Sequence, residues 1–214
     1  MDKNYKYDKN IFLSNIYKKL IISSQININP DLLNINILDN IKQNLKRQEL
    51  NKCNKYGLIT NIYNIDQKVN GILSSNNQVN SSVIFKVNYY ANICIPLKND
   101  CIPAKIIKKN NQLLLAIFEK IKIVIDLGHT GFNANKFTKE NTDIIHNKTK
   151  KELNINDNII IKIIDIKFHP KDTEIKAFGF LYDYYEDNEI VDNYIADIKK
   201  ENTNISEITM EDLY

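Results

Sequence analysis

Carboxylate, imidazole and thiol side chains are the groups most able to perform catalysis or bind a metal, and in this sequence they are dispersed. Asp126 and Asp165, which lie at the ends of predicted strands, could pair for general acid–base chemistry, although such residues more often close strands or cap turns. His129, His146 and His169 are too scattered for a local metal site. No serine or cysteine has the sequence context of a nucleophile elbow. The sequence therefore predicts no catalytic residue, no metal site and no cofactor.

Phosphate-binding loops need glycines that let the backbone approach the phosphate, and the chain has five glycines in all. Neither G-x-G-x-x-G nor G-x-x-x-x-G-K-[ST] occurs. The nearest segment is DLGHTGF, residues 126–132, which lacks the lysine and a following helix pattern. An ordinary turn after a strand is the simpler interpretation of this segment.

A binding surface has more support than an active site, because lysines and aromatic residues recur together in the second half of the chain. The members of this set are Lys105, Lys108, Lys109, Lys120, Lys122, Phe132 and Lys136. Lysine charge and aromatic stacking together hold single-stranded nucleic acid without sequence preference. A solvated face is an equal alternative, since the chain is rich in lysine and its one arginine, Arg47, leaves almost no bidentate phosphate ligands.

The net charge of +3 is unevenly distributed along the chain. It amounts to +7 over residues 1–98, +2 over 99–186 and −6 over 187–214. The basic part favours a polyanionic partner or an acidic protein surface, and the acidic end would repel nucleic acid. The last segment is typical of a tail, with a short helix expected near residues 190–198.

Cysteine usage and hydropathy indicate the compartment. Cys53, Cys94 and Cys101 show no CxxC spacing, which favours a reducing compartment without disulfides. The first residues lack the apolar core of a secretory signal, and no run approaches the roughly 18 apolar residues of a membrane helix. We therefore expect a soluble intracellular protein with no membrane contact. The abundance of Ile, Asn and Lys indicates an AT-rich genome, such as that of a protist, a large DNA virus or a low-G+C bacterium.

The elements that position these residues fall into two predicted domains. In the first, Pro30 opens a helix whose apolar stripe of Ile37/Leu38, Ile41 and Leu45 faces a sheet. The sheet strands are expected at residues 16–28, 56–65, from Gly71 onward and 83–97, with a loop at 66–70 and a polar turn at 74–82. The first domain ends near Lys98–Asp100.

The second domain is predicted to be a five-stranded OB-fold barrel. Short strands are expected at residues 102–108, 112–118, 121–127, 159–168 and 174–181. A polar connector, residues 128–157, with one helical turn separates the third strand from the fourth. Three strands, a long connector and two strands is the order of an OB barrel. The predicted fold class is therefore α+β, with an N-terminal α/β domain (1–98), the barrel (99–186) and an acidic tail (187–214).

The segments KYGLITNIYNID, VNGIL and VIFKVNYYANICIPLKNDCIPAKI, read in order, resemble one protein family. They are similar to the stalk subunit of multi-subunit RNA polymerases, which is the seventh subunit of eukaryotic RNA polymerase II and its archaeal counterpart. The matching features are the helix after Pro30, a Tyr-Gly strand, a tip loop that ends at glycine, the crossing strand with Tyr89-Tyr90-Ala91, and Ala177-x-Gly179 in the last strand. The resemblance covers residues 12–186.

The resemblance implies a non-catalytic accessory subunit of a DNA-directed RNA polymerase, in which an N-terminal tip docks on the core near the clamp. The implied docking residues are Tyr56, Gly57, Leu58, Ile59, Asp66 and Gly71. A bulge at Gly57 and a tight turn at Gly71 are the structural alternatives. The implied partners are core polymerase subunits, a small stalk partner subunit and nascent single-stranded RNA, which the barrel would contact.

Two departures from the family pattern affect the turns of the barrel. The family often has glycine in the first barrel hairpin, where this chain has Lys108–Gln112, and asparagine can replace it by tolerating positive φ. The turn that enters the barrel has Asn99 instead of glycine. The acidic tail extends beyond the usual family end.

Composition favours a large cytoplasmic DNA virus as the source, so the chain would act in the host cytoplasm (in a viral factory) or in the virion. A cellular eukaryotic chain would act in the nucleus. Two other functions remain open. One is a free-standing OB-fold RNA-binding protein of translation or RNA processing. The other is a small barrel nuclease, which would need metal-dependent activity at Asp126 or Asp165.

Overall fold

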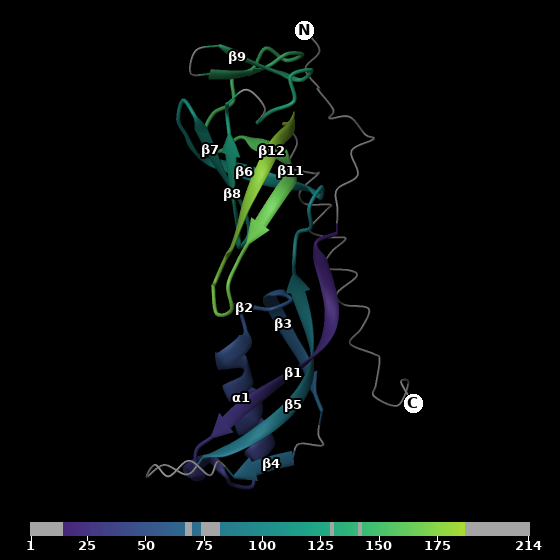
Figure 1. Ribbon diagram of the computed structural model, residues 1–214, viewed down its shortest axis with the longest axis vertical. Coiled ribbons are helices and arrows are strands. Elements are labelled where there is room, and N and C mark those ends of the chain that lie inside the picture. The colour runs from purple at the N-terminus through teal and green to yellow at the C-terminus, as the bar shows by residue number, and fades with distance from the viewer. Residues whose placement is uncertain (1–14, 67–69, 74–81, 129–130, 141–142, 187–214) are drawn as a thin grey trace. The chain divides into compact units, whose positions relative to one another are not determined.

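Residues 15–66, 70–73, 82–128, 131–140 and 143–186 are described by the computed structural model, and they fall into two units (Figure 1). Tyr17–Ile95 together with His169–Thr173 form the first, here called the helix–sheet unit. The other described residues form the barrel unit. The acidic segment 187–214, with the helix expected near 190–198, lies outside the described residues, as do loop residues 67–69 and most of the polar turn expected at 74–82.

The helix–sheet unit is one antiparallel sheet with a helix on it. The strands are β1 (Tyr17–Ile28), β2 (Cys53–Asn54), β3 (Gly57–Ile65), β4 (Asn70–Leu73) and β5 (Val83–Cys94). The order is β1-β5-β3-β2, and β4 pairs with β5 beyond the end of β3. The expected strands are confirmed, apart from shifts of a few residues at their ends.

The helix begins later than predicted. Residues Pro30–Leu32 form only a 3-10 turn, η1, and the α-helix α1 spans Ile37–Glu49. Asn34 explains the delay, because its Oδ1 accepts a hydrogen bond from the Asn36 N–H at 2.9 Å and so closes a local turn. Asparagine side chains compete with the helical backbone for such bonds. The stripe is correct for Ile41 and Leu45, which are buried, but Leu38 is 49% exposed.

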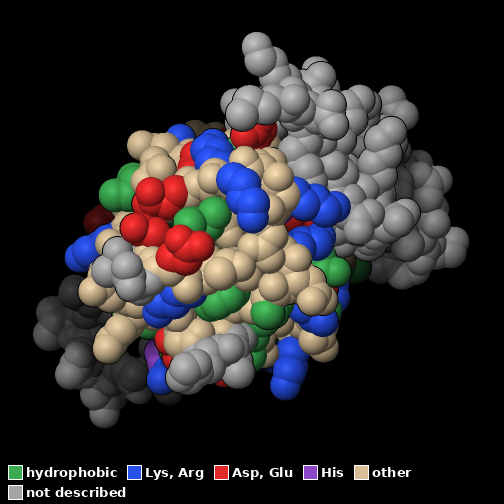
Figure 2. Space-filling model, turned by 90° about the horizontal axis from the view of Figure 1, so that it is seen from above, with side chains coloured by type: hydrophobic (Ala, Val, Ile, Leu, Met, Phe, Trp, Pro, Cys, Tyr) green, Lys and Arg blue, Asp and Glu red, His purple; other side chains and the backbone are tan. Residues whose placement is uncertain are grey.

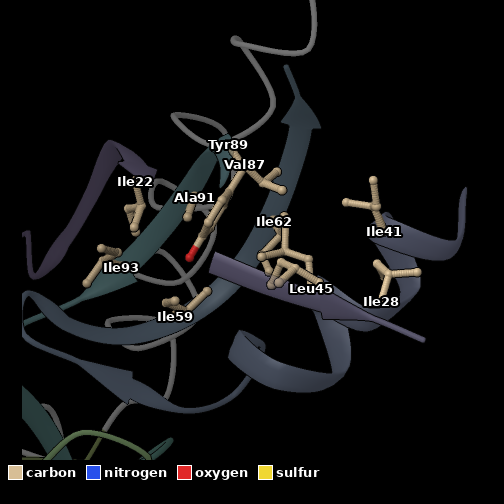
Figure 3. Packing of buried hydrophobic residues seen from close by; sticks show 11 residues of the cluster. Ile22, Ile28, Ile41, Leu45, Ile59, Ile62, Val87, Tyr89, Ala91 and Ile93 are labelled. Carbon is tan, nitrogen blue, oxygen red and sulfur yellow. The ribbon is translucent and has the colours of Figure 1, made fainter. Parts of the chain in front are cut away.

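One apolar cluster holds α1 on the sheet (Figure 3). Ile41 and Leu45 of α1 pack with Ile22, Ile26 and Ile28 of β1 and with residues of β3 and β5. Side chains from four elements therefore converge on one core. Tyr89 is its largest member, and its hydroxyl lies 3.3 Å from the Ser24 hydroxyl. Complete burial of one isoleucine or leucine side chain in this core stabilises the folded state by about 1.5–3 kcal/mol.

The barrel unit contains a closed barrel of five strands. They are β6 (Cys101–Lys109), β7 (Leu113–Phe118), β8 (Ile121–Asp126), β11 (Asn158–Lys167) and β12 (Ile175–Tyr185). The strand order is β11-β12-β8-β7-β6, with β11 also paired to β6. β8 and β12 run parallel and the other pairs are antiparallel. The predicted order of strands is confirmed, and the barrel is OB-like.

The connector between β8 and β11 differs from the prediction of a helical turn. It contains an antiparallel hairpin of β9 (Phe137–Glu140) and β10 (Asp143–His146). Phe137, Ile144, His146 and Leu153 of this region are buried. The alternation of apolar residues is too short in each strand to be read from the sequence. Burial of these side chains stabilises strands that would be marginal alone.

Asparagine takes the place of glycine in two turns of the barrel unit, the turn that enters the barrel and the first hairpin, and does so in different ways. Asn99 has φ +74°, so it takes the left-handed conformation of the expected glycine. Neither Asn110 nor Asn111 has positive φ, contrary to the expectation for the first hairpin. Instead, Oδ1 of Asn110 accepts hydrogen bonds from the N–H groups of Gln112 (3.0 Å) and Leu113 (2.6 Å). Side-chain bonds of this kind replace a glycine turn.

Candidate nucleic-acid interface on the barrel wall

Outward-facing residues of the five barrel strands form a row in continuous register. Lys105 pairs with Ile117, Ile117 with Lys122, Lys122 with Lys176, and Lys176 with Lys167. We call these five residues the lysine row. Neighbouring strands lie about 4.8 Å apart, so the row follows the barrel wall for roughly 19 Å.

A second row lies next to the first and is more apolar. It consists of Lys108, Leu115, Val124, Phe178 and Asp165, again paired in register from strand to strand. The Phe178 side chain is 55% exposed, although phenylalanine is usually buried. The two rows together are here called the outer face. Lysines beside an exposed ring supply the charge and the stacking surface that hold single strands.

Strand alternation explains why the sequence builds this surface. In β8, Ile121, Ile123 and Ile125 point into the barrel, so Lys122 and Val124 must point out. In β6 the alternation is interrupted by a register shift between Ile106 and Lys108. The shift is a β-bulge that leaves both Ile107 and Lys108 exposed. The bulge therefore brings Lys108 to the second row.

Carboxylates moderate the charge of the outer face. Glu174 forms an ion pair with Lys122, with Oε2 and Nζ 2.7 Å apart, and Asp165 is itself part of the second row. Within the described ranges, five lysines near or in the rows make no ion pair, namely Lys105, Lys108, Lys120, Lys167 and Lys176. Figure 2 shows lysine and carboxylate side chains intermixed on the face that it presents, without one continuous cationic patch.

Two predicted RNA contacts are instead paired with carboxylates of the same unit. Lys109 lies 2.9 Å from Asp143 and 3.0 Å from Glu152. Burial lowers the pKa of Lys109, but hydrogen bonds to both carboxylates outweigh this and raise it. Lys136 lies 2.5 Å from the fully buried Asp183. These bonds tie the connector to the barrel, so neither lysine is available to a ligand without breaking an ion pair.

The other predicted contacts are distributed over the barrel. Lys105 and Lys122 belong to the lysine row and Lys108 to the second row. Lys120 is exposed in the turn before β8, where its carbonyl accepts a hydrogen bond from the Ile175 N–H at 2.9 Å, next to Lys176. Phe132 is half-buried and forms an isolated bridge with Leu181, away from both rows.

A polar cluster links the connector to β12. His146 and Asp183 are fully buried, with Nε2 and Oδ1 3.8 Å apart, and the His146 Nδ1 lies 2.9 Å from the Thr149 hydroxyl. Burial lowers the pKa of His146, which Asp183 opposes and Lys136 reinforces. The imidazole is therefore neutral at neutral pH. The cluster consists of internal contacts that hold β10 against β12.

The carboxylates considered for catalysis do not meet. Asp126 ends β8 and Asp165 lies on β11, with β12 between these strands. Two strand spacings and two residues of offset put them roughly 12 Å apart, too far to share a proton. Oδ1 of Asp126 accepts the Gly128 N–H at 2.9 Å, which is a turn contact. Among the described residues, no group of three or more His, Cys, Asp or Glu side chains could hold a metal ion.

The proposed docking residues lie at opposite ends of β3. Tyr56 and Gly57 are at its start, where Leu58 pairs with Cys94, whereas Asp66 follows its end and Gly71 pairs with Phe85. Gly57 has φ +140°, and a Cβ there would lie 2.7 Å from the carbonyl oxygen of Cys94. It completes the β2–β3 turn and is not a bulge. Gly71 lies within β4 and is not in a tight turn.

The proposed docking residues also differ in how far they are buried. Leu58 and Ile59 are fully buried, so they can shape a docking surface but cannot contact a partner directly. Tyr56, Asp66 and Gly71 are at least partly exposed.

Exposed apolar side chains occur on several elements near the Gly71 end of the sheet. β1 ends there at Ile28, opposite Val83, and β4 pairs along the same end of β5 (Figure 1). Ile72 of β4 is 70% exposed. The chain between β1 and α1 adds exposed Leu32, Leu33 and Ile35, the last 98% exposed, and then Leu38 in the first turn of α1. Apolar groups exposed together are typical of interaction sites.

Comparison with known proteins gives an informative similarity. No family model matches the chain. The chain is 23% identical over 184 residues to a protein of Acanthamoeba polyphaga mimivirus that carries the provisional name of a DNA-directed RNA polymerase subunit. The aligned region is 82% of this chain and 86% of that protein. It is longer than either structural unit, so it includes parts of both.

Sequence reasoning missed several exposed residues that the structure brings together. Lys167, Lys176 and Phe178 belong to the two rows, and the alternation in IKAFGF, residues 175–180, could have indicated the last two. Lys167 could not be assigned, because its neighbours depend on the β11–β12 register. Ile35 and Ile72 gave no signal, since an isolated apolar residue in a loop or short strand is common.

Among the described residues, no helix is long and apolar enough to cross a membrane.

Proposed function

We propose that the chain is a non-catalytic stalk subunit of a DNA-directed RNA polymerase. The similarity to the mimivirus protein, which extends over most of both chains, is the observation that supports an RNA polymerase subunit. The stalk position is the finer part of the proposal, and it is supported by the sequence motifs together with the OB-like barrel. A viral chain would act in the host cytoplasm or in the virion.

The barrel contacts emerging RNA through the outer face. Lys105, Lys122, Lys167 and Lys176 attract the phosphates, and Phe178 stacks on a base. Because this attraction depends on counterion release, affinity falls steeply with salt. Neither row has an arginine, asparagine or glutamine, so little sequence preference is expected.

The helix–sheet unit docks on the polymerase core through its Gly71 end. Asp66, Gly71 and the exposed Ile35, Leu38 and Ile72 supply a carboxylate and exposed apolar side chains near this end. A few buried anchor residues dominate the affinity of protein interfaces. Leu58 and Ile59 support the sheet from inside, and Tyr56 with Gly57 shapes its opposite end. A small stalk partner subunit is part of the proposal, without an assigned surface.

Purification of the tagged protein from its native source, followed by mass spectrometry, tests the proposal. Large polymerase subunits in near-equal amounts are the expected result. Ribosomal or RNA-processing partners would favour the free-standing RNA-binding protein instead.

Two variants then locate the docking surface. Ile35→Asp with Ile72→Asp should abolish polymerase association, while Ile155→Asp, at an exposed isoleucine of the barrel unit, should leave it intact. Gly57→Arg is a poor probe, because the clash with Cys94 would disturb the sheet itself. Association that survives the double substitution would refute the docking site.

A further inference from the structure

The outer face and the acidic segment, residues 187–214, belong to the same chain and have opposite charge. The acidic segment follows β12 directly after Glu186, and its net charge is −6. The barrel strand that it leaves is the strand that carries Lys176 and Phe178. The cationic outer face and the anionic segment are therefore connected through β12 in one polypeptide.

The acidic segment also matches the outer face in its mixture of residue types. Its eight carboxylates alternate with apolar side chains, as in EIVDNYIADI, residues 189–198. The outer face likewise combines lysines with exposed Phe178 and the partly exposed Ile117 and Val124. Both charge attraction and apolar burial are thus available to the same pair of surfaces.

The acidic segment is long enough to reach the outer face. From Lys176 to Tyr185, β12 extends roughly 30 Å at about 3.3 Å per residue. The length of the acidic segment sets an upper limit of roughly 92 Å on its span, at about 3.3 Å per residue. Tethering over such a distance gives an effective concentration of the order of millimolar, so even a weak contact would be populated.

We propose that residues 187–214 bind the outer face of the barrel unit and compete there with single-stranded RNA. The intramolecular contact is supported by the opposite charges, the residue types and the length of the acidic segment. Only the competition rests on the proposed RNA-binding function. RNA must then displace a polyanion whose own attraction to the lysines also weakens as the salt concentration rises. The full chain consequently binds RNA more weakly, and with a shallower salt dependence, than the outer face alone would.

The contact itself is tested without RNA, by comparing amide NMR spectra of two full-length chains. In one, all eight carboxylates of the acidic segment become amides: D187N, E189Q, D192N, D197N, E201Q, E207Q, E211Q and D212N. Shifts of the amides of Lys122, Lys176 and Phe178 relative to the unmodified chain are expected. Shifts confined to the helix–sheet unit, or none outside the acidic segment, would overturn the proposal. A charge-preserving control with D187E, D192E, D197E and D212E should resemble the unmodified chain.

The competition is tested by fluorescence anisotropy with a labelled 12-nucleotide oligouridylate. The amide variant should bind about 3- to 10-fold more tightly at low salt, and the difference should shrink at high salt. Because eight amides also raise the net charge, the same change is made in a chain with K105Q, K167Q and K176Q. If the gain in RNA affinity is a general charge effect, it persists in the chain with the three lysine substitutions. If it comes from relieved competition at the outer face, it disappears in that chain.

The outcomes separate the two hypotheses. If no chain binds RNA but the NMR shifts occur, the acidic segment occupies the outer face and the RNA-binding function is wrong. If the unmodified chain and the amide variant bind RNA equally well, the RNA-binding function stands and the competition is refuted.

Discussion

Lys122 and Lys176 lie opposite each other on the parallel strands β8 and β12, yet only Lys122 has a carboxylate partner, Glu174 at 2.7 Å. Within the part of the chain that the structure describes, Lys176 makes no ion pair. Two lysines in equivalent strand positions therefore differ in the charge that they can offer to a ligand. This difference makes the outer face testable one residue at a time.

Single charge changes at this pair should have unequal effects on RNA binding. Lys176→Gln should weaken binding and reduce the salt slope by about 0.7, the value for one phosphate contact on a single strand. Lys122→Gln should have a smaller effect, since Glu174 already neutralises part of its charge. Glu174→Gln should strengthen binding by freeing Lys122. Anisotropy titrations at several salt concentrations measure all three.

A matched control is Lys42→Gln, at an exposed lysine of α1. It removes the same charge from the helix–sheet unit and leaves the barrel unit unchanged. If it changes the affinity as much as Lys176→Gln does, the binding is general and the outer face is only solvated.

Phe178→Ala should weaken RNA binding by about 1–3 kcal/mol, because a base loses its stacking partner. The folded state should lose little stability, since more than half of the ring is already in water. Phe178→Tyr keeps the ring and should retain the affinity. Equal affinity of the alanine variant and the parent chain would remove Phe178 from the interface.

Gly179→Ala should destabilise the barrel. A Cβ at this position would lie 2.4 Å from Cγ2 of Ile161 and 2.7 Å from Cγ2 of Ile123. Overpacking of a filled core costs about 1–3 kcal/mol. Urea denaturation measures the loss of unfolding free energy, and Gly128→Ala at an exposed glycine serves as control. Comparable values for the two variants would contradict the close packing at Gly179.

The buried His146 should make stability depend on pH in the acid range. Burial lowers its pKa, so below about pH 6.5 the unfolded chain binds a proton that the folded chain does not. Stability is therefore retained above this pH and falls as the pH decreases, by at most about 1.4 kcal/mol per pH unit. His146→Gln, measured by urea denaturation between pH 5 and 8, should lack this component. An unchanged pH profile would show that another group is responsible.

Several features of the fold could be predicted from the sequence because they depend on local patterns. Alternating isoleucines in β8 identify a strand and its buried face, and the spacing of Ile41 and Leu45 identifies the helical stripe. The order of strands around a long connector was enough to predict an OB-like barrel. Asn99 could be expected in a turn, since asparagine tolerates positive φ.

The lysines show where local information ends. Lys105, Lys109 and Lys122 look alike in the sequence, but Lys109 is neutralised by Asp143 and Glu152, which lie more than 30 residues away. The rows of the outer face exist only because five strands pair in one register, and the bulge at Ile107 decides which side Lys108 faces. Strand pairing and ion pairs join residues distant in the chain, so tertiary structure alone decides which charges remain available. The sequence by itself determined the barrel strands and the buried faces of β8 and of α1 at Ile41 and Leu45, because side-chain period is a property of neighbouring residues.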